Sequence, residues 1–325
     1  MKSSSELQQI IDIIEKHDNF LLTSHQDPDG DSIGSLIGLA EFIENLGKRV
    51  VIFNEGRLPA KYKFLDPKGK IHFAPSAIEF KPEIAIVLEC PEYERIGFVQ
   101  DLIDDNMTLI NIDHHPRNRY YGDLNYNDES SCAVAEILYE MIRTNEHKIT
   151  PVIAEAFYAA IASDTGRFKF TNTGPKCFKT ASELASAGAN PKLIADKIFS
   201  SYSAGTIRLL GHLLQSLEMK ADGKICVLKL RLADLLKYDV MVEDTEGIVD
   251  YSLTIEGVKV GIFFKERDAN TVKVSLRSQN GIDISKFAIM KGGGGHANAA
   301  GFTIALPFDE ASNKVIDEVT EFLNG

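Results

Sequence analysis

The sequence predicts an α/β protein with a parallel-sheet N-terminal domain, a helical connector and a smaller α+β C-terminal domain. Its 325 residues are too many for one compact core and suit two domains. In the first two-thirds, short continuous apolar runs alternate with longer segments of helical periodicity, which is typical of buried parallel strands between helices. In the last third, strand-like runs predominate. We place the domains at residues 1–190 and 219–325, with the connector at 191–218.

Each predicted element of the first domain rests on a local pattern. The predicted strands are short apolar runs at Phe20–Ser24, Val50–Phe53, Ile84–Leu88 and Thr108–Ile112. The predicted helices have apolar residues at helical spacing and lie at Ser35–Leu46, Ser131–Arg143 and Pro151–Ser163. Proline in the first turn of the last helix supports that helix start.

The connector and the second domain follow a different pattern. Helical periodicity extends from Ile194 to Glu218. Strand-like runs then occur at Lys224–Leu228, Val258–Phe264 and Thr271–Leu276. This order predicts a helix that leads into a small α+β domain.

The composition excludes several classes of protein. With 44% hydrophobic and 25% charged residues, the chain is typical of globular proteins rather than disordered or fibrous ones. No apolar run approaches the ~18 residues that would span a bilayer, and the acidic, amphipathic start does not resemble a signal peptide. The four cysteines form no Cys-x-x-Cys pair, which favours reduced thiols and a cytoplasmic location.

The net charge of −12 is unevenly distributed. Between Tyr251 and Gly301, seven basic residues outnumber four acidic ones, so this segment carries +3 and the remainder −15. The overall charge disfavours binding to long nucleic acid, which usually needs a broad basic face. The basic segment suits an anionic ligand.

Clusters of carboxylates and imidazoles follow the predicted strands and one helix of the first domain. They comprise His25, Asp29 and Asp31, then Glu89, then Asp113, His114 and His115, and finally Asp164. Any one of them alone is more often a turn or a hydrogen-bonded polar residue. Because the carboxyl ends of parallel strands face one crevice, we expect the clusters to converge there. Carboxylates at that density raise one another's pKa unless cations compensate them, and a donor set without thiolates favours Mn²⁺ or Mg²⁺.

A glycine-rich run lies in the basic segment. Four consecutive glycines, 292–295, precede His296, and Arg277 and Ser278 end a predicted strand upstream. Alone, such a run is more often a flexible turn. Beside basic residues, its backbone N–H groups and an arginine that can make two hydrogen bonds to one phosphate favour an anion site.

The ordered motifs resemble those of the DHH phosphoesterase superfamily. The matching segments are His25-x-x-x-Asp29-x-Asp31, Asp113-His114-His115, Ser163-Asp164-Thr165-Gly166 and Gly293-Gly294-Gly295-His296. The resemblance covers nearly the whole chain. It is closest to the two-domain members with a DHH-associated C-terminal domain, of the oligoribonuclease (nanoRNase) and pAp phosphatase type, where pAp is 3′-phosphoadenosine 5′-phosphate.

The resemblance implies two divalent cations, with Mn²⁺ expected before Mg²⁺. The expected ligands are His25 and Asp29 for one ion, and Asp31, His114 and Asp164 for the other. Glu89 would bridge the ions. Many family members have aspartate at this position. Because glutamate is longer, we expect either that the end of the strand is retracted or that one of the two ions binds more weakly.

The resemblance also implies roles in substrate binding. Asp113 would orient a ligand, and His115 would contact the substrate phosphate. The far end of the substrate would be held by Arg277, Ser278, Gly293, Gly294, Gly295 and His296. The active site would lie in a cleft between the two domains.

The expected function is hydrolysis of short oligoribonucleotides or pAp by metal-activated water, as in oligoribonucleases and 3′(2′),5′-bisphosphate nucleotidases. We expect a homodimer and no binding to membranes or long nucleic acid. Three alternatives remain open. They are a pyrophosphatase or exopolyphosphatase, a phosphodiesterase of linear or cyclic di-AMP, and a non-catalytic nucleotide-binding module whose metal centre Glu89 has weakened.

Overall fold

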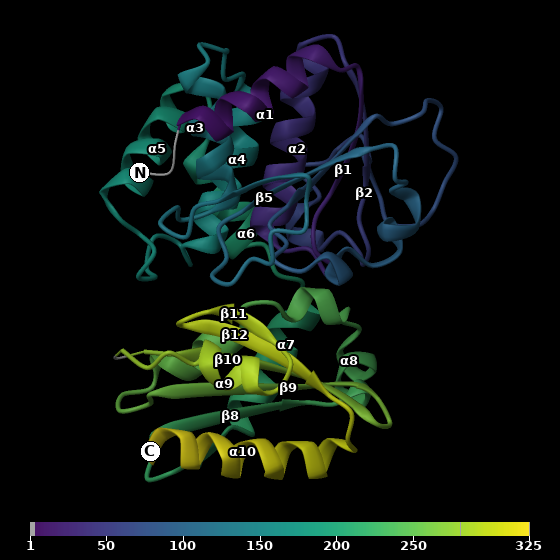
Figure 1. The fold of residues 1–325 in the computed structure, drawn as a ribbon. Coiled ribbons are helices and arrows are strands. Elements are labelled where there is room, and N and C mark those ends of the chain that lie inside the picture. The colour runs from purple at the N-terminus through teal and green to yellow at the C-terminus, as the bar shows by residue number, and fades with distance from the viewer. Residues whose placement is uncertain (1–3, 280, 325) are drawn as a thin grey trace. The chain divides into compact units, whose positions relative to one another are not determined.

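The computed structural model describes residues 4–279 and 281–324, which form two compact units (Figure 1). The first unit ends at Ser201 and the second begins at Tyr202. The single helix predicted from Ile194 to Glu218 is wrong. The structure has α6 (Pro191–Phe199), α7 (Ala204–Gln215) and then β7 (Glu218–Lys220). A new helix starts at Ala204 because the Ser203 hydroxyl caps it, accepting a hydrogen bond from the Thr206 amide at 3.0 Å.

A six-stranded sheet, parallel throughout, forms the centre of the first unit. Its strands lie in the order β3 (Ile71–His72), β2 (Arg49–Phe53), β1 (Asn19–Thr23), β4 (Ile84–Leu88), β5 (Thr108–Asp113) and β6 (Leu124–Asn127). The four predicted strands are confirmed to within one residue at each end. Strands β3 and β6 escaped prediction because they have only two and four residues.

Both faces of this sheet are buried, which explains the continuous apolar runs of its strands. On one face, side chains such as Phe20, Leu22 and Ile86 pack in one core with the helices. These helices are α1 (Ser4–Lys16), α2 (Gly30–Asn45), α3 (Val134–Thr144) and α4 (Pro151–Asp164), and α5 (Pro175–Ser186) follows them in the chain. On the other face, Leu21 and Val87 pack with the 3₁₀ segment Tyr93–Leu102.

Helices α2 and α4 approach each other closely through two glycines of α2. A Cβ atom at Gly34 would lie 2.4 Å from the carbonyl oxygen of Ala156, and one at Gly38 would lie 2.2 Å from the ring of Phe157. Any larger residue at either position would push the two helices apart. This contact fixes the relative position of the two helices that carry Asp31 and Asp164.

The second unit is built on a mixed sheet, which confirms the predicted α+β class. Its strands lie in the order β11 (Gly294–His296), β12 (Ala299–Ile304), β10 (Thr271–Ser278), β9 (Val260–Asp268), β8 (Ile225–Leu230) and β7. Neighbours are antiparallel except for β8 and β9. One core cluster includes α9 (Ser285–Met290) and α10 (Phe308–Asn324), and another includes α7 and α8 (Leu232–Tyr238). In the described part of the chain, no helix is both long and apolar enough to cross a membrane.

Candidate metal centre

The predicted clusters of the first unit meet at the carboxyl ends of β1, β4 and β5, which are neighbouring strands. Ligand atoms of His25, Asp29 and Glu89 all lie within 4.8 Å of one another, and so do those of Asp31, Glu89 and His114. Glu89 belongs to both groups. The structure therefore brings two adjoining sets of potential ligands together around one shared carboxylate, at the edge where an open α/β sheet usually binds ligands.

His25 is held so that one ring nitrogen faces Glu89. Its Nδ1 lies 2.8 Å from the carbonyl oxygen of Gln26, and its Nε2 lies 3.3 Å from Glu89 Oε2. Ser32 connects the two residues, because its hydroxyl donates a hydrogen bond to Glu89 and lies 3.1 Å from His25 Nε2. A ligating histidine is commonly oriented in this way, by a carbonyl on its other ring nitrogen.

The two aspartates of the first motif are fixed by helix N-termini. Asp29 caps α2, with its Oδ1 accepting hydrogen bonds from the amides of Asp31 and Ser32 at 3.0 and 3.1 Å. This cap starts α2 at Gly30, five residues before the predicted start. Asp31 accepts hydrogen bonds from the first amides of α3, from Val134 at 2.6 Å and Ala135 at 3.2 Å. Unsatisfied N–H groups at a helix start favour a carboxylate at both places.

His114 faces two carboxylates. Its Nδ1 lies 3.0 Å from the carbonyl oxygen of Ser131, and its Nε2 lies 3.8 Å from both Asp31 Oδ2 and Asp164 Oδ2. Asp164 ends α4, and Asn172 donates a hydrogen bond to its Oδ2 at 3.2 Å. Asp164 is thus brought to the group that contains Asp31, Glu89 and His114.

Asp113 organises the histidine pair that follows β5. Its Oδ1 accepts hydrogen bonds from the amides of His114 and His115 and lies 2.9 Å from His115 Nδ1. Asn118 donates to its Oδ2 at 2.7 Å. Burial alone would raise the pKa of Asp113, but His115 and then His114 and Asn118 outweigh it, so that this pKa lies below its usual range. An ionised Asp113 therefore fixes the orientation of the His115 ring.

The electrostatics of the centre favour a cation. Burial, followed by repulsion from Asp29, Asp31 and Asp164, raises the pKa of Glu89 well above its ordinary value. Burial, with a contribution from Arg95, lowers the pKa of His25 to about 4. A neutral imidazole among crowded carboxylates is the protonation state that metal ligation requires. The buried donor set of imidazoles and carboxylates, without thiolates, therefore fits divalent cations.

The glycine-rich run of the second unit is an edge strand rather than a loose turn. Residues 294–296 form β11, which pairs with β12 in the register Gly294↔Gly301, Gly295↔Ala300 and His296↔Ala299. Gly295 has φ +126°, and a Cβ there would lie 2.4 Å from the Ala299 carbonyl oxygen. A Cβ at Gly293, just before the strand, would lie 2.1 Å from the Gly301 carbonyl oxygen. The run needs glycine because two backbones approach closely.

Arg277 and Ser278 end β10 and are both held within their own unit. The Arg277 Nε donates a hydrogen bond to Asp250 Oδ1 at 2.8 Å, and its side chain is 20% exposed. The buried Ser278 hydroxyl lies 2.6 and 3.1 Å from the carbonyl oxygens of Ile282 and Ala297. Ser278 thus stabilises the segment that leads to β11, and its contact with substrate stays a prediction.

Further basic residues share the sheet face of Arg277. Lys265 on β9 is paired directly with Lys273 on β10, and positions 273 and 277 lie on the same face of β10. Burial, and then the charges of Lys273 and Arg267, lower the pKa of Lys265 to about 7. Like charges placed opposite each other repel. Asp250, which binds Arg277, and Glu246, which acts on Lys265, offset part of the positive charge of this face.

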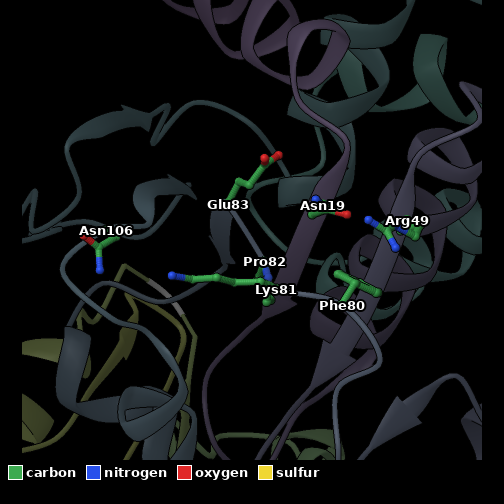
Figure 2. A pocket seen from close by; sticks show the side chains of 7 residues that line it. All are labelled: Asn19, Arg49, Phe80, Lys81, Pro82, Glu83 and Asn106. Carbon is green, nitrogen blue, oxygen red and sulfur yellow. The ribbon is translucent and has the colours of Figure 1, made fainter.

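A separate pocket lies at the amino ends of strands β1 and β2 in the first unit (Figure 2). It has a volume of about 410 Å³, and its lining includes Asn19 and Arg49, which start β1 and β2. The Arg49 guanidinium lies 5.0 Å from the centre of the Phe80 ring in this lining. The amino ends of parallel strands lie opposite their carboxyl ends, so this pocket is remote from the carboxylate cluster.

Sequence reasoning missed three residues that hold the centre together. Ser32 joins His25 to Glu89, Asn118 holds Asp113, and Asn172 holds Asp164. Ser32 directly follows Asp31, and Asn118 and Asn172 lie a few residues after the Asp113–His115 and Ser163–Gly166 motifs. Polar residues just after such motifs are the signal that could have identified them.

Comparisons with known proteins show which family this chain belongs to. A model of the DHH family N-terminal domain matches residues 19–161, and a model of the DHHA1 domain matches residues 222–325. The chain is 30% identical over 317 residues to the bifunctional oligoribonuclease and PAP phosphatase NrnA of Thermus thermophilus, covering 93% of this chain and 89% of the relative. It is 29% identical over 312 residues to the protein of the same name from Bacillus subtilis, covering 95% and 96%.

A solved structure resembles the whole chain. The crystal structure of an exopolyphosphatase-related protein from Bacteroides fragilis superposes with a TM-score of 0.89 at 25% identity. The match covers 99% of this chain and 98% of that one. Similarity thus extends over both units.

Proposed function

Because this chain belongs to the DHH family and is a phosphoester hydrolase of that family, we propose that it cleaves short oligoribonucleotides and PAP with two divalent cations. The observation that carries the proposal is the pair of ligand groups that share Glu89. The relatives named for both activities match the chain over more than nine-tenths of its length, which supports the same substrate class.

We assign the ligands as the two groups divide them. His25 and Asp29 would hold one ion. Asp31, His114 and Asp164 would hold the other, and Glu89 would belong to both. We propose Mn²⁺ rather than Mg²⁺, because Mg²⁺ favours oxygen donors and retained water, whereas this set includes two imidazoles.

The chemistry combines the cations with groups of the chain. When bound, two such ions polarise the phosphoryl oxygens and lower the pKa of the attacking water. Asp113 accepts the hydrogen bond of His115 Nδ1–H, so in the doubly protonated imidazolium form Nε2–H would donate a hydrogen bond to a phosphoryl oxygen and stabilise its developing charge. The carboxylates of Asp29 and Asp31 keep their positions because helix amides bind them. Preorganisation of this kind lowers the cost of reaching the transition state.

We propose that Arg277 and the β11 segment with His296 bind a substrate phosphate away from the scissile bond. The support is the positive sheet face around Lys265 and Lys273 and the close backbone approach at Gly295. Ser278 would act indirectly, by fixing the segment before β11.

Replacing Arg277 with alanine is expected to raise KM for PAP by about 10-fold or more, since a charge-assisted hydrogen bond contributes roughly 1.5–3 kcal/mol. Steady-state kinetics with Mn²⁺ would measure this change. Lys286→Ala is the control, because it removes a 65% exposed cation of the same unit. If Arg277→Ala instead weakens Mn²⁺ binding and leaves KM unchanged, the assignment of Arg277 to phosphate binding rather than to metal binding is wrong.

Hydrolysis per chain end is expected to be fastest for substrates of about two to five nucleotides, by roughly 10-fold over a 25-mer. The reason is electrostatic: a chain of net charge −12 gains little from the many phosphates of a long strand, and few phosphate contacts give a shallow dependence on salt. Turnover of PAP, a dinucleotide, a 5-mer and a 25-mer at several salt concentrations tests this and the proposed function together. Equal rates for the 5-mer and the 25-mer with a steep salt slope would contradict the preference.

Hydrolysis of inorganic polyphosphate is a second candidate, favoured by the structural match to the exopolyphosphatase-related protein. Adding pyrophosphate and polyphosphate to the same assay separates the candidates. We expect nucleotide substrates to be preferred. Preferential release of phosphate from polyphosphate would favour the second candidate.

We also propose a cytoplasmic enzyme that forms a homodimer. Cys90, Cys132, Cys177 and Cys226 are free thiols in the structure, which suits a reducing compartment. Sedimentation of the purified protein would test the dimer.

A further inference from the structure

A pocket of about 270 Å³ lies in the first unit beside the end of α4, the helix that carries Asp164. Its walls come from three segments and include Tyr158 and Ala162 of α4, Arg167 and Phe168 of the following turn, and Ala195 and Phe199 of α6. Tyr158 and Ala162 are one helical turn apart and face the pocket together. None of the lining residues belongs to the candidate ligand groups, yet Ala162 and Arg167 lie only two residues before and three residues after Asp164 in the chain.

The turn that leads into the pocket is strained. Gly166, Arg167 and Phe168 have φ values of +56°, +68° and +60°, so two successive residues with side chains lie in the left-handed region. The turn is held by its hydrogen bonds, from the Arg167 amide to the Ala162 carbonyl at 2.9 Å and from the Phe168 amide to Thr165 Oγ1 at 3.1 Å. Strain of this type concentrates at functional sites. Here its effect is to present one guanidinium and one aromatic ring to the same pocket.

The rings and the guanidinium form stacking surfaces. The Phe168 and Phe178 rings are stacked, with centroids 5.6 Å apart and planes 21° apart, and Tyr158 meets Phe168 edge to face at 6.0 Å. The Arg167 guanidinium lies 4.5 Å above the centre of the Phe199 ring. Aromatic rings and guanidinium planes are the groups on which proteins stack the bases of single-stranded RNA.

The surrounding segment is also basic. Between residues 165 and 200, the sequence has six basic residues and two acidic ones, a balance of +4. The basic residues are Arg167, Lys169, Lys176, Lys179, Lys192 and Lys197. This segment belongs to the part of the chain outside residues 251–301, whose total charge of −15 conceals it. Lys176 binds Glu140 at 3.0 Å and Lys192 binds Asp196, so Arg167, which lines the pocket, is the cation that the phosphate of a bound nucleotide would meet.

We propose that this pocket binds a nucleobase of the oligonucleotide substrate, stacked against its aromatic lining beside Arg167. The proposal rests on the proposed function for the identity of the substrate. Base recognition would then take place in the first unit, which also carries the candidate metal ligands. Such a pocket would favour nucleotides over inorganic phosphates, because inorganic phosphates have no base to stack.

The test compares the adenine dinucleotide pApA with a dinucleotide of the same backbone that lacks the bases. Ala195→Phe fills the pocket from an exposed helix position, so it removes no core contact. Arg167→Ala removes the planar cation, and Arg167→Lys keeps the charge but not the plane. Val152→Phe is the matched control, since it adds a similar ring at a 49% exposed position at the other end of α4.

The wild type is expected to prefer pApA, and both Ala195→Phe and Arg167→Ala should lower the ratio of kcat/KM between the two substrates by about 10-fold, the scale of one base–aromatic stack. Arg167→Lys should resemble Arg167→Ala, and Val152→Phe should keep the ratio of the wild type. An unchanged ratio in Ala195→Phe, or a wild-type ratio in Arg167→Lys, would overturn the stacking assignment while the proposed function stands.

If the wild type cleaves neither dinucleotide, the proposed function fails, and the pocket is then tested by binding alone. Calorimetric titration with adenosine 5′-monophosphate should show about 10-fold weaker binding to Ala195→Phe than to the wild type. Equal affinities would reject the pocket as a base site.

Discussion

Replacement of His114 with alanine is expected to lower kcat for PAP and dinucleotides by about 100-fold or more. His114 Nε2 lies 3.8 Å from both Asp31 and Asp164, so its loss removes the one imidazole of that ligand group and leaves carboxylates that repel one another. Steady-state kinetics at saturating Mn²⁺ would measure the effect. Chelation of the wild type should abolish turnover, and added Mn²⁺ should restore it.

His147→Ala is the matched control for this experiment. His147 is a partly buried histidine of the same unit, with its Nε2 2.9 Å from Glu15 Oε1, and it belongs to neither ligand group. Its replacement should leave kcat near that of the wild type. Full activity of His114→Ala, or undiminished turnover in excess chelator, would refute the two-metal mechanism.

Replacement of Glu89 with glutamine is expected to change thermal stability in opposite directions with and without metal. In the metal-free protein, the variant removes an acid whose pKa is raised by burial and by Asp29, Asp31 and Asp164. A raised pKa in the folded state means that wild-type stability falls as the pH rises above the value for an unfolded glutamate. The gain in Tm should therefore be larger at pH 8 than at pH 5. Each kcal/mol added to the free energy of unfolding should raise Tm by roughly 2–4 °C.

With Mn²⁺ present, the same variant should be the less stable protein. If Glu89 is a ligand of both ions and its loss weakens binding about 100-fold, the metal contributes roughly 2.7 kcal/mol less to stability. Thermal unfolding with and without Mn²⁺ measures both the expected increase in Tm of the metal-free variant and its expected decrease when Mn²⁺ is bound. The same Mn²⁺-induced rise in Tm for Glu89→Gln and the wild type would show that Glu89 is no ligand.

Glu136→Gln is the control for this stability experiment. Glu136 is also a buried acid whose pKa is raised by burial, but it binds the Cys132 amide at 2.9 Å and lies outside both ligand groups. Its replacement should leave the Mn²⁺-induced rise in Tm unchanged. A reduced rise here would mean that general weakening of the fold, rather than loss of a ligand, explains the result at Glu89.

The sequence was sufficient for the parallel sheet and for the convergence of the ligands, because both follow from strongly constrained patterns. Strands buried on both faces must be apolar without interruption, and residues at their carboxyl ends must meet at one edge. The start of α2 was placed too late because the Asp29 cap lies within a segment rich in turn residues. The break between α6 and α7 was missed because apolar spacing continues across it, while the Ser203 cap is a local signal.

Other features depended on contacts that no sequence pattern shows. The glycine run at 292–295 has the composition of a turn, and its pairing with β12 depends on the close approach of Gly295 to Ala299. The role of Ser32 in joining His25 to Glu89 appears only when residues 57 positions apart are brought together. Charge averaged over a long stretch also concealed the basic segment at 165–200.

The double role of the first-motif aspartates has a consequence for how activity could be lost in evolution. Asp29 caps the N-terminus of α2, and Asp31 binds the first amides of α3, with the same carboxylates that we propose as metal ligands. Loss of such a cap costs about 1 kcal/mol in stability, whatever the catalytic need. A pseudoenzyme descended from this protein would therefore retain both aspartates for folding and lose His114 or Asp164 first. In such descendants the presence of Asp29 and Asp31 would show only that the helices need their carboxylates. The presence or absence of His114 and Asp164 would be the better indicator of catalytic activity.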